Sequence, residues 1–261
     1  MNPKIIFFDI DGTILSHRNF QILDSTKKAI RKARENGHLT FVNTGRTYAE
    51  IDAEIKDVGF DGYVCGCGTF ISYHSKVLYH ATVDDTTSKE IIKDLQYYNI
   101  DAVLEGTHAI YFNSKIENET MKMVYDMYKT RRFNLQTWED PSPVFDKFCI
   151  WLNRINTIED FRKKYETLFD FIDRDTYFLE IVPEGCSKAT GIEYLLNHLA
   201  IPFEDAYAMG DSANDYSMLR YVKNSIGMGN SEQLILDIVS FVTKDVDEDG
   251  VIHALKHFDI I

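Results

Sequence analysis

Short apolar segments alternate with helical segments over residues 4–65, and this alternation constrains the fold more than any other feature. Lys4 to Phe8 reads KIIFF and ends at Asp9, which is typical of a buried strand. The next segments predict a helix at 26–36, a strand at 39–43, a helix at 48–58 and a strand at 63–65. This β-α-β-α-β order predicts a parallel sheet that is covered by helices.

The pattern changes after a predicted hairpin at residues 69–80, and it returns after Ser187. The segment between mixes helical runs (89–97, 117–129, 158–165), strand-like runs (102–105, 109–112, 148–152, 177–182) and a loop at 138–143. This mixture is typical of an α+β unit with an antiparallel sheet. An amphipathic helix at 188–199, a strand at 206–209, a short helix at 215–221 and extended pieces at 225–228 and 241–242 follow. We therefore predict an α/β core of residues 1–82 and 185–261, interrupted by an inserted domain of residues 83–184.

The composition of the chain limits the classes of molecule that it is expected to bind. The net charge of −13 gives an acidic field that repels nucleic-acid phosphates, so a nucleic-acid binder is not expected. The same field means that a phosphate site needs local positive groups inside a cleft. No segment approaches the roughly 18–20 apolar residues of a membrane span. The N-terminal residues do not read as a signal peptide, and we expect a cytoplasmic protein with four reduced cysteines.

Polar clusters follow three of the predicted core strands. They are Asp9-Ile10-Asp11-Gly12-Thr13, Thr44-Gly45-Arg46 and Gly210-Asp211-Ser212-Ala213-Asn214-Asp215, and Lys188 opens the helix that follows the insert. Ligands of open parallel sheets bind beyond the carboxyl ends of the strands, where all four groups would meet. Carboxylates can hold a hard cation there, while a hydroxyl, an amide and a lysine can hold phosphate.

This set of groups fits phosphoryl transfer. Asp9 can attack phosphorus in line, which splits hydrolysis into transfer to the enzyme and hydrolysis of an acyl phosphate. Asp11 can protonate the leaving oxygen and later take a proton from water. A cation such as Mg²⁺ would neutralise charge between Asp9, Asp211 and the phosphoryl oxygens.

The four motifs together resemble those of the haloacid dehalogenase (HAD) superfamily. Phe8 to Thr13 resembles the first motif, Thr44-Gly45-Arg46 the second, Lys188 the third and Gly210 to Asp215 the fourth. Their order, the insert and the later Gly227-Met228-Gly229-Asn230 and Asp249-Gly250-Val251 are similar to Cof-type (subfamily IIB) phosphatases. The resemblance implies a Rossmann-like parallel-sheet core with an inserted α+β cap of the C2 type.

The resemblance also implies a role for each motif residue. Asp9 would be the nucleophile and Asp11 the general acid/base. Asp9, the backbone carbonyl of Asp11, and Asp211 would hold Mg²⁺. Residues that would hold the phosphate are Thr44, Gly45, Lys188 and Asn214. Asp215 would be an outer carboxylate that orients metal-bound water or Lys188, and Arg46 is either a further outer residue or a structural one that pairs with an acid.

One residue departs from the Cof-type pattern. Cof-type chains carry Asn-Gly after the third strand, whereas this chain reads Cys65-Gly66-Cys67-Gly68, with Cys67 in the place of that Asn. The local turn or a contact to the cap would differ. Simpler interpretations exist for single motifs, since Asp211 and Asn214 could cap a helix and Thr44 could be an ordinary N-cap.

The function implied is a Mg²⁺-dependent phosphohydrolase for a small phosphorylated metabolite, such as a sugar phosphate or a phosphorylated cofactor. A phosphotransferase or phosphomutase with the same aspartyl phosphate is the alternative. A non-catalytic receiver module is disfavoured, because receivers are about half this length and carry no insert. We expect a monomer or weak dimer with neither nucleic-acid nor membrane partners.

Overall fold

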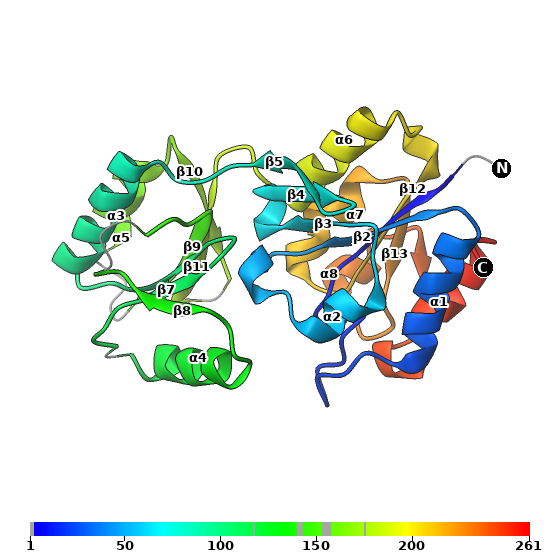
Figure 1. Cartoon of the computed structure of the whole chain (residues 1–261), viewed down its shortest axis with the longest axis horizontal. Helices are drawn as coiled ribbons and strands as arrows, with labels where there is room; N and C mark the ends of the chain where they lie inside the picture. Colours follow the sequence, from blue (N-terminus) through cyan, green and yellow to red (C-terminus); the bar gives the residue numbers. More distant parts are fainter. Residues whose placement is uncertain (1–2, 117, 140–142, 153–157, 175) are drawn as a thin grey trace. The chain divides into compact units, whose positions relative to one another are not determined.

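The chain folds into two compact units in the computed structural model (Figure 1), which describes residues 3–116, 118–139, 143–152, 158–174 and 176–261. The first unit comprises Met1–Gly45, Asp52–Leu78 and Ser187–Ile261. The second comprises Arg46–Ile51 and Tyr79–Cys186. The predicted domain ranges differ from these units by placing 46–51 in the core and by a few residues at each boundary.

An eight-stranded sheet with the order β14-β13-β12-β1-β2-β3-β4-β5 forms the centre of the first unit. Its strands are β1 (Ile5–Phe8), β2 (Leu39–Asn43), β3 (Gly62–Cys65), β4 (Phe70–Tyr73), β5 (Lys76–His80), β12 (Ala206–Gly210), β13 (Asn224–Gly227) and β14 (Phe241–Val242). Pairing is parallel from β14 through β3, and β4 runs antiparallel to β3. The central strand β1 is buried throughout, as its unbroken apolar sequence requires.

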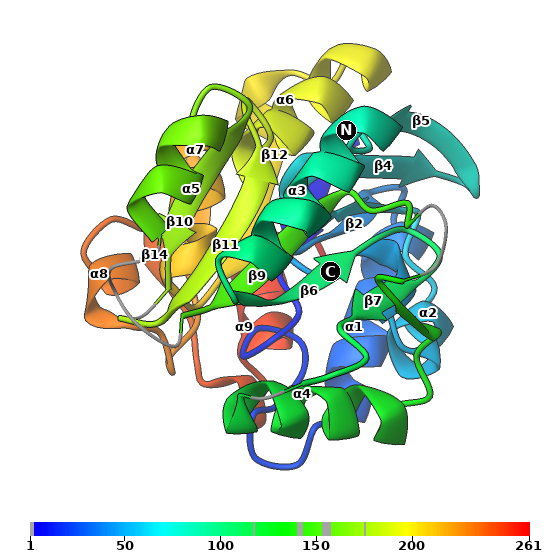
Figure 2. The same cartoon turned by 90° about the vertical axis from the view of Figure 1, so that its left-hand side faces the viewer.

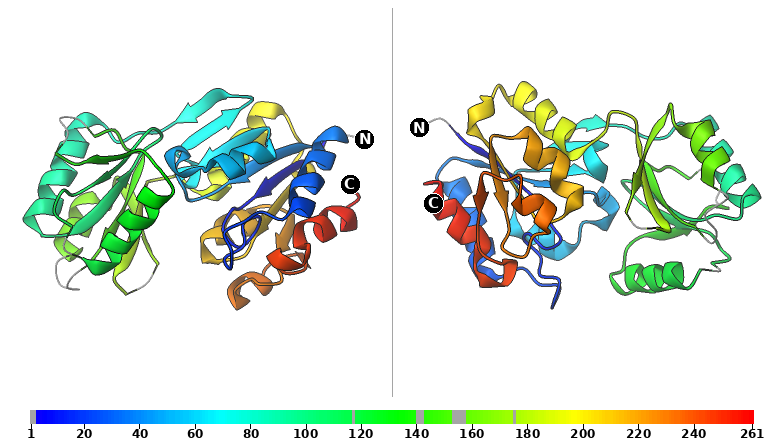
Figure 3. Two further views of the ribbon diagram at one scale, coloured as in Figure 1. Left: turned by 60° about the horizontal axis from the view of Figure 1, so that its bottom comes forward. Right: turned by 180° about the vertical axis from the view of Figure 1, so that it is seen from behind.

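Helices cover both faces of this sheet. They are α1 (Asp24–Glu35), α2 (Ala53–Val58), α6 (Lys188–Leu199), α7 (Tyr216–Tyr221), α8 (Gln233–Leu236) and α9 (Gly250–His257). Ile5 and Phe7 of β1 belong to the hydrophobic cluster that includes Ile192 and Leu195 of α6 and Met218 of α7. On the other face, α1 packs beside α9, which is the red helix in Figures 1 and 3.

The second unit is built on a six-stranded sheet with the order β10-β11-β9-β6-β7-β8. The strands are β6 (Asp101–Glu105), β7 (Ile110–Phe112), β8 (Leu135–Thr137), β9 (Lys147–Trp151), β10 (Phe169–Asp173) and β11 (Phe178–Pro183). Every described pair is antiparallel except β7 with β8. Helices α3 (Asp85–Tyr97) and α5 (Ile158–Tyr165) pack on one face and α4 (Glu119–Thr130) on the other (Figure 2).

The predicted fold class is confirmed, with a parallel-sheet core and a mainly antiparallel insert. Two short strands of the insert, β8 and β10, were not predicted. The predicted helix start at Glu117 and residues 140–142 of the predicted loop lie outside the described residues. Among the helices of the described ranges, none is long and apolar enough to span a membrane.

The predicted continuous helix over residues 48–58 is wrong. A 3₁₀ turn at Tyr48–Glu50 ends at Ile51, which is extended, and α2 begins separately at Ala53. The Glu50 side chain accepts hydrogen bonds from the Thr47 backbone N–H (2.7 Å) and hydroxyl (2.8 Å) and from Tyr128 of α4 (2.5 Å). These contacts hold the turn within the second unit, so a helix cannot continue through it.

Candidate active site

The residues that follow β1, β2 and β12 lie at one edge of the first-unit sheet. These strands are neighbours and run parallel, with Phe8 opposite both Met209 and Val42. Asp9 therefore directly follows β1 at the edge where Asp211 follows β12 and Thr44 follows β2. All three side chains are buried, Asp9 being 2 % exposed. The sheet topology thus brings together three of the predicted site residues.

Lys188 reaches this edge from the first turn of α6. Its ammonium lies 2.6 Å from Asp9 Oδ1 and 2.6 Å from Asp215 Oδ1, and the side chain is 1 % exposed. The buried Asn43 side chain donates a hydrogen bond to the Lys188 carbonyl (2.9 Å). A helix N-terminus is an unfavourable place for a cation, so the two carboxylates must compensate both the burial and the helix dipole.

Asp215 has both of its oxygens occupied. Oδ1 accepts from Lys188, while Oδ2 accepts from the backbone N–H groups of Asp211 (2.9 Å) and Ser212 (3.2 Å). Asp215 therefore fixes the lysine and the backbone that carries Asp211. This geometry fits the orienting role implied for Asp215 better than direct coordination of a cation.

Burial and mutual repulsion shift the protonation of the carboxylates. Burial raises the pKa of Asp9 to about 7, with the charge of Asp215 adding to the shift and that of Lys188 opposing it. Burial, followed by the charges of Asp9 and Asp215, raises the pKa of Asp211 to about 8. Burial alone would lower the pKa of Lys188, but the charges of Asp215 and Asp9 hold it above its ordinary value.

The same carboxylates can receive a cation. One oxygen each of Asp9, Asp211 and Asp215 lies within 4.8 Å of the others, and because both Asp215 oxygens already accept hydrogen bonds, Asp9 and Asp211 are the carboxylates that can bind the cation directly. Asp9 Oδ2 is buried without a hydrogen-bond partner in the described part of the chain, an arrangement that is costly unless another group completes it. Hard oxygen donors of this kind suit Mg²⁺, so the residues present fit the expected ion.

Asp11 lies in the turn that follows β1, and its charge contributes to the raised pKa of both Asp9 and Asp211. The next residue, Gly12, has a φ of +77°. A Cβ atom at this position would overlap the Asp211 carboxylate and the His17 ring, so the turn needs glycine for space as well as for conformation.

The other predicted residues are placed as follows. The Thr44 N–H donates to Val64 O (2.9 Å), and the Thr44 carbonyl accepts from the N–H of Cys67 (3.1 Å). Gly45 is the last residue of this segment of the first unit. Arg46 belongs to the second unit, where it donates to the Glu50 carbonyl (3.4 Å). Asn214 is half-buried and accepts from the Ser212 hydroxyl (2.9 Å).

Cys67, which we expected in the place of the Cof-type Asn, lies in a left-handed backbone conformation with φ 55° and ψ 40°. Asn tolerates this region much better than Cys does, so the substitution places strain in the turn beside Thr44. Gly68 comes next, and a Cβ atom there would lie 2.5 Å from the Ser187 carbonyl. The turn therefore packs directly against the start of the helix that carries Lys188.

Three residues around the site were not predicted from the sequence. Asn43 holds the start of α6, as described above. Asn230 donates to the Gly12 carbonyl (2.8 Å) and accepts from Val246 N–H (2.9 Å). The His17 Nε2 atom lies 3.7 Å from Asp211 Oδ2. The resemblance pointed to the segment that contains Asn230 but assigned it no contact, and no sequence signal indicated His17.

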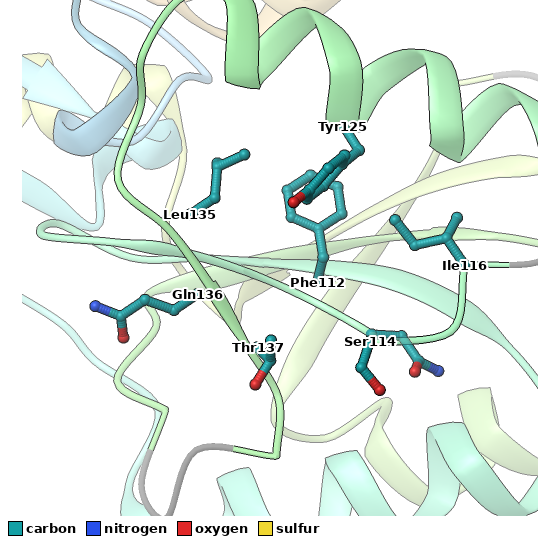
Figure 4. A pocket seen from close by; sticks show the side chains of 8 residues that line it. Phe112, Ser114, Ile116, Tyr125, Leu135, Gln136 and Thr137 are labelled. Carbon is teal, nitrogen blue, oxygen red and sulfur yellow. The ribbon is translucent and has the colours of Figure 1, made fainter.

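A separate cavity of about 470 Å³ lies in the second unit (Figure 4). The rings of Phe112 and Tyr125, together with Leu135 and Gln136, line part of it. Every described residue that lines it is formally uncharged, so these residues offer no cation for a phosphate. None of the predicted catalytic or metal residues lines this cavity.

Comparisons with known proteins identify the family. The model of the haloacid dehalogenase-like hydrolases matches residues 6–255. Bacillus subtilis (strain 168) YkrA is 28% identical, and the alignment covers 100% of both chains. The HMP-PP phosphatase of Yersinia pseudotuberculosis is 26% identical, over 98% of this chain and 95% of that protein.

A solved structure of similar fold points to the same family. The HAD subclass IIB sugar phosphatase BT4131 superimposes with a TM-score of 0.81 at 25% identity, over 99% of this chain and 100% of that one. The family and enzyme class expected from the motifs are therefore confirmed: this phosphatase belongs to the haloacid dehalogenase-like hydrolases.

Proposed function

We propose that the protein is a Mg²⁺-dependent phosphohydrolase that forms a phosphoaspartate on Asp9 and acts on a small phosphorylated metabolite. The observation that carries this proposal is the state of the Asp9 carboxylate. One oxygen is fixed by Lys188 at 2.6 Å, and the other is buried without a hydrogen-bond partner among the described residues. A carboxylate that is positioned through one oxygen, while its other oxygen has no hydrogen-bond partner, can use that second oxygen to bind or attack an incoming group.

The cation would be held by Asp9, Asp211 and the backbone carbonyl of Asp11. When bound, Mg²⁺ supplies positive charge to the phosphoryl oxygens. Thr44, Gly45, Lys188 and Asn214 would hold the phosphate. Lys188 is suited to this role because, among the described residues, two of its three N–H donors go to carboxylates, which leaves one for a phosphoryl oxygen.

The proposed reaction has two steps. A carboxylate oxygen of Asp9 forms a bond to phosphorus, while the bond from phosphorus to the leaving oxygen breaks and Asp11 gives that oxygen a proton. Asp11 then takes a proton from water as the water attacks the phosphoaspartate, which frees phosphate and restores Asp9. Asp215 keeps Lys188 and the backbone at Asp211 in place throughout.

The substrate class rests on two relatives. One is named an HMP-PP phosphatase and the other a sugar phosphatase, and both match nearly the whole chain. A sugar phosphate or a phosphorylated cofactor is therefore the proposed substrate. The cytoplasmic location, the monomeric or weakly dimeric state and the absence of nucleic-acid or membrane partners stay predictions.

The test is release of phosphate from an aryl phosphate, with and without Mg²⁺, by the full chain. Asp9→Asn should abolish release, whereas Asp57→Asn, which changes an exposed carboxylate on α2, should not affect it. Mass spectrometry after an acid quench should find the phosphoryl group on the peptide that contains Asp9. Undiminished release by Asp9→Asn would refute the assignment of the nucleophile. In a parallel assay with a sugar phosphate as substrate, an isomerised sugar phosphate without free phosphate would favour the phosphomutase instead.

A further inference from the structure

His17 lies beside the candidate metal site, although no motif includes it. Its Nε2 atom is 3.7 Å from Asp211 Oδ2, and the side chain is 61% exposed. This distance is longer than a hydrogen bond, so the imidazole and the carboxylate lie close together without a direct hydrogen bond between these two atoms. At this separation, one metal ion could bind both the imidazole nitrogen and the carboxylate oxygen.

The backbone around His17 is held in a compact turn. Ser16 N–H donates to the Gln21 carbonyl (3.1 Å), and Phe20 N–H donates to the Ser16 carbonyl (3.0 Å). The Ser16 hydroxyl accepts from Arg18 N–H (3.1 Å). The position of the imidazole beside Asp211 is therefore supported from both sides of His17 in the chain.

Gly12 supplies the space in which the two donors approach each other. A Cβ atom on Gly12 would overlap both Asp211 Oδ2 and His17 Nε2, so both atoms lie directly over its α-carbon. Any other residue at this position would push the imidazole or the carboxylate away. The same turn carries Asp11, whose carbonyl is an expected metal ligand.

Coordination geometry makes a shared ion feasible. Two donors bound to one ion at about 2.1 Å lie about 3.0 Å apart in octahedral geometry and about 3.4 Å apart in tetrahedral geometry. The observed 3.7 Å therefore requires a movement of less than about 1 Å by an exposed side chain. Asp9, whose Oδ2 atom is buried and without a hydrogen-bond partner in the described ranges, has a carboxylate oxygen within 4.8 Å of one of Asp211 and is a further donor for the same ion.

We propose that His17 is a nitrogen ligand that adds to the Asp9–Asp211 site when the bound ion is one that accepts imidazole, such as Zn²⁺, Co²⁺ or Ni²⁺. Mg²⁺ prefers oxygen ligands and would be held without His17, whereas borderline transition ions gain affinity from an imidazole. The site would then bind these ions more tightly than its carboxylates alone allow. This inference rests on the proposed metal site.

The test measures metal binding to the chelator-treated full chain. Co²⁺ binding is followed by visible absorption, and Mg²⁺ binding by calorimetry, for the wild-type protein and His17→Ala. The expected result is a loss of Co²⁺ affinity on the order of tenfold, with Mg²⁺ affinity changed less than about twofold. The matched control is His198→Ala, which removes another exposed imidazole of the first unit, in the last turn of α6, and should leave both affinities unchanged.

Two results would overturn the proposal. Equal Co²⁺ affinity in wild type and His17→Ala would show that the imidazole does not bind the ion. A parallel loss of Co²⁺ and Mg²⁺ affinity would show that His17 only shapes the turn. The variant Asp211→Asn separates this proposal from the proposed function. Loss of Mg²⁺ binding in Asp211→Asn would support the proposed metal site, whatever the result for His17→Ala. Unchanged Mg²⁺ binding in Asp211→Asn would refute the metal site itself.

Discussion

Replacement of Lys188 by methionine removes the positive charge of the site while nearly keeping the volume of the side chain. The Lys188 side chain is 1 % exposed, and its ammonium lies 2.6 Å from both Asp9 and Asp215, which are themselves buried. Without it, two buried carboxylates are left uncompensated. Removal of one partner from a buried ion pair costs about 3–5 kcal/mol. For a unit of this size, such a loss corresponds to a decrease in Tm of roughly 6–20 °C.

The second unit offers a matched control for this variant. Lys147 is 4% exposed and lies 2.6 Å from Glu105 and 2.7 Å from Glu180, so its surroundings are chemically similar. Lys147→Met should cause a comparable loss of stability, but it leaves the groups around Asp9 unchanged. Phosphatase activity measured below the transition temperature should therefore fall severely in Lys188→Met and much less in Lys147→Met.

The two tryptophans allow the effects on the two units to be separated. Trp138 and Trp151 both belong to the second unit, so tryptophan fluorescence follows that unit, whereas far-UV circular dichroism follows the whole chain. In the presence of a chelator, Lys188→Met should lower the Tm measured by circular dichroism, and Lys147→Met should lower the Tm measured by tryptophan fluorescence. A Tm for Lys188→Met within about 2 °C of wild type would refute the argument that Lys188 compensates buried charge.

Three further predictions follow from single positions. Gly12→Ala should displace the Asp211 carboxylate, because the added Cβ atom would overlap it, and should lower kcat on the order of a hundredfold. Calorimetry should also show weaker Mg²⁺ binding. A variant with the kcat of wild type would contradict the argument that a Cβ atom does not fit at this position. Cys67→Asn should relieve the strained turn and raise the Tm by roughly 2–4 °C, for about 1 kcal/mol, and a lower Tm would contradict this. The hydrogen bond to Asp146 (2.9 Å) raises the pKa of His80 above its ordinary 6.5, so its stabilisation is complete below about pH 6.5 and is lost as pH rises through the folded value. The fluorescence-detected Tm should therefore fall less between about pH 6 and pH 8 in His80→Gln than in wild type, and equal slopes would refute the assignment.

Local patterns were sufficient to predict the framework of the site. The apolar run before Asp9 and the amphipathic segment that begins at Lys188 predicted β1 and α6, whose observed bounds are Ile5–Phe8 and Lys188–Leu199. The parallel arrangement of the strands then placed their carboxyl ends at one edge. The proximity of Asp9, Lys188 and Asp211 follows from these two kinds of information, without knowledge of any side-chain contact.

Contacts between distant residues could not be predicted in the same way. Asn230 and Gly12 are 218 positions apart, and Glu50 meets Tyr128 across 78 positions. The second contact ended the predicted helix after Glu50, although the local sequence from Tyr48 to Val58 is compatible with a helix. Tertiary partners overrode local preference there.

The balance of charge at this site favours a bound cation. Lys188 contacts Asp9 and Asp215, and Asp11 and Asp211 lie close enough for their charges to act on the same cluster, so the fully ionised cluster carries three excess negative charges. Burial and repulsion already raise the pKa of Asp9 to about 7 and that of Asp211 to about 8, which shows how poorly the fold tolerates this excess. A phosphate dianion would add two more negative charges to the same space. Under the proposed function a divalent cation would offset this charge, so substrate affinity measured in chelator should be far weaker than in Mg²⁺.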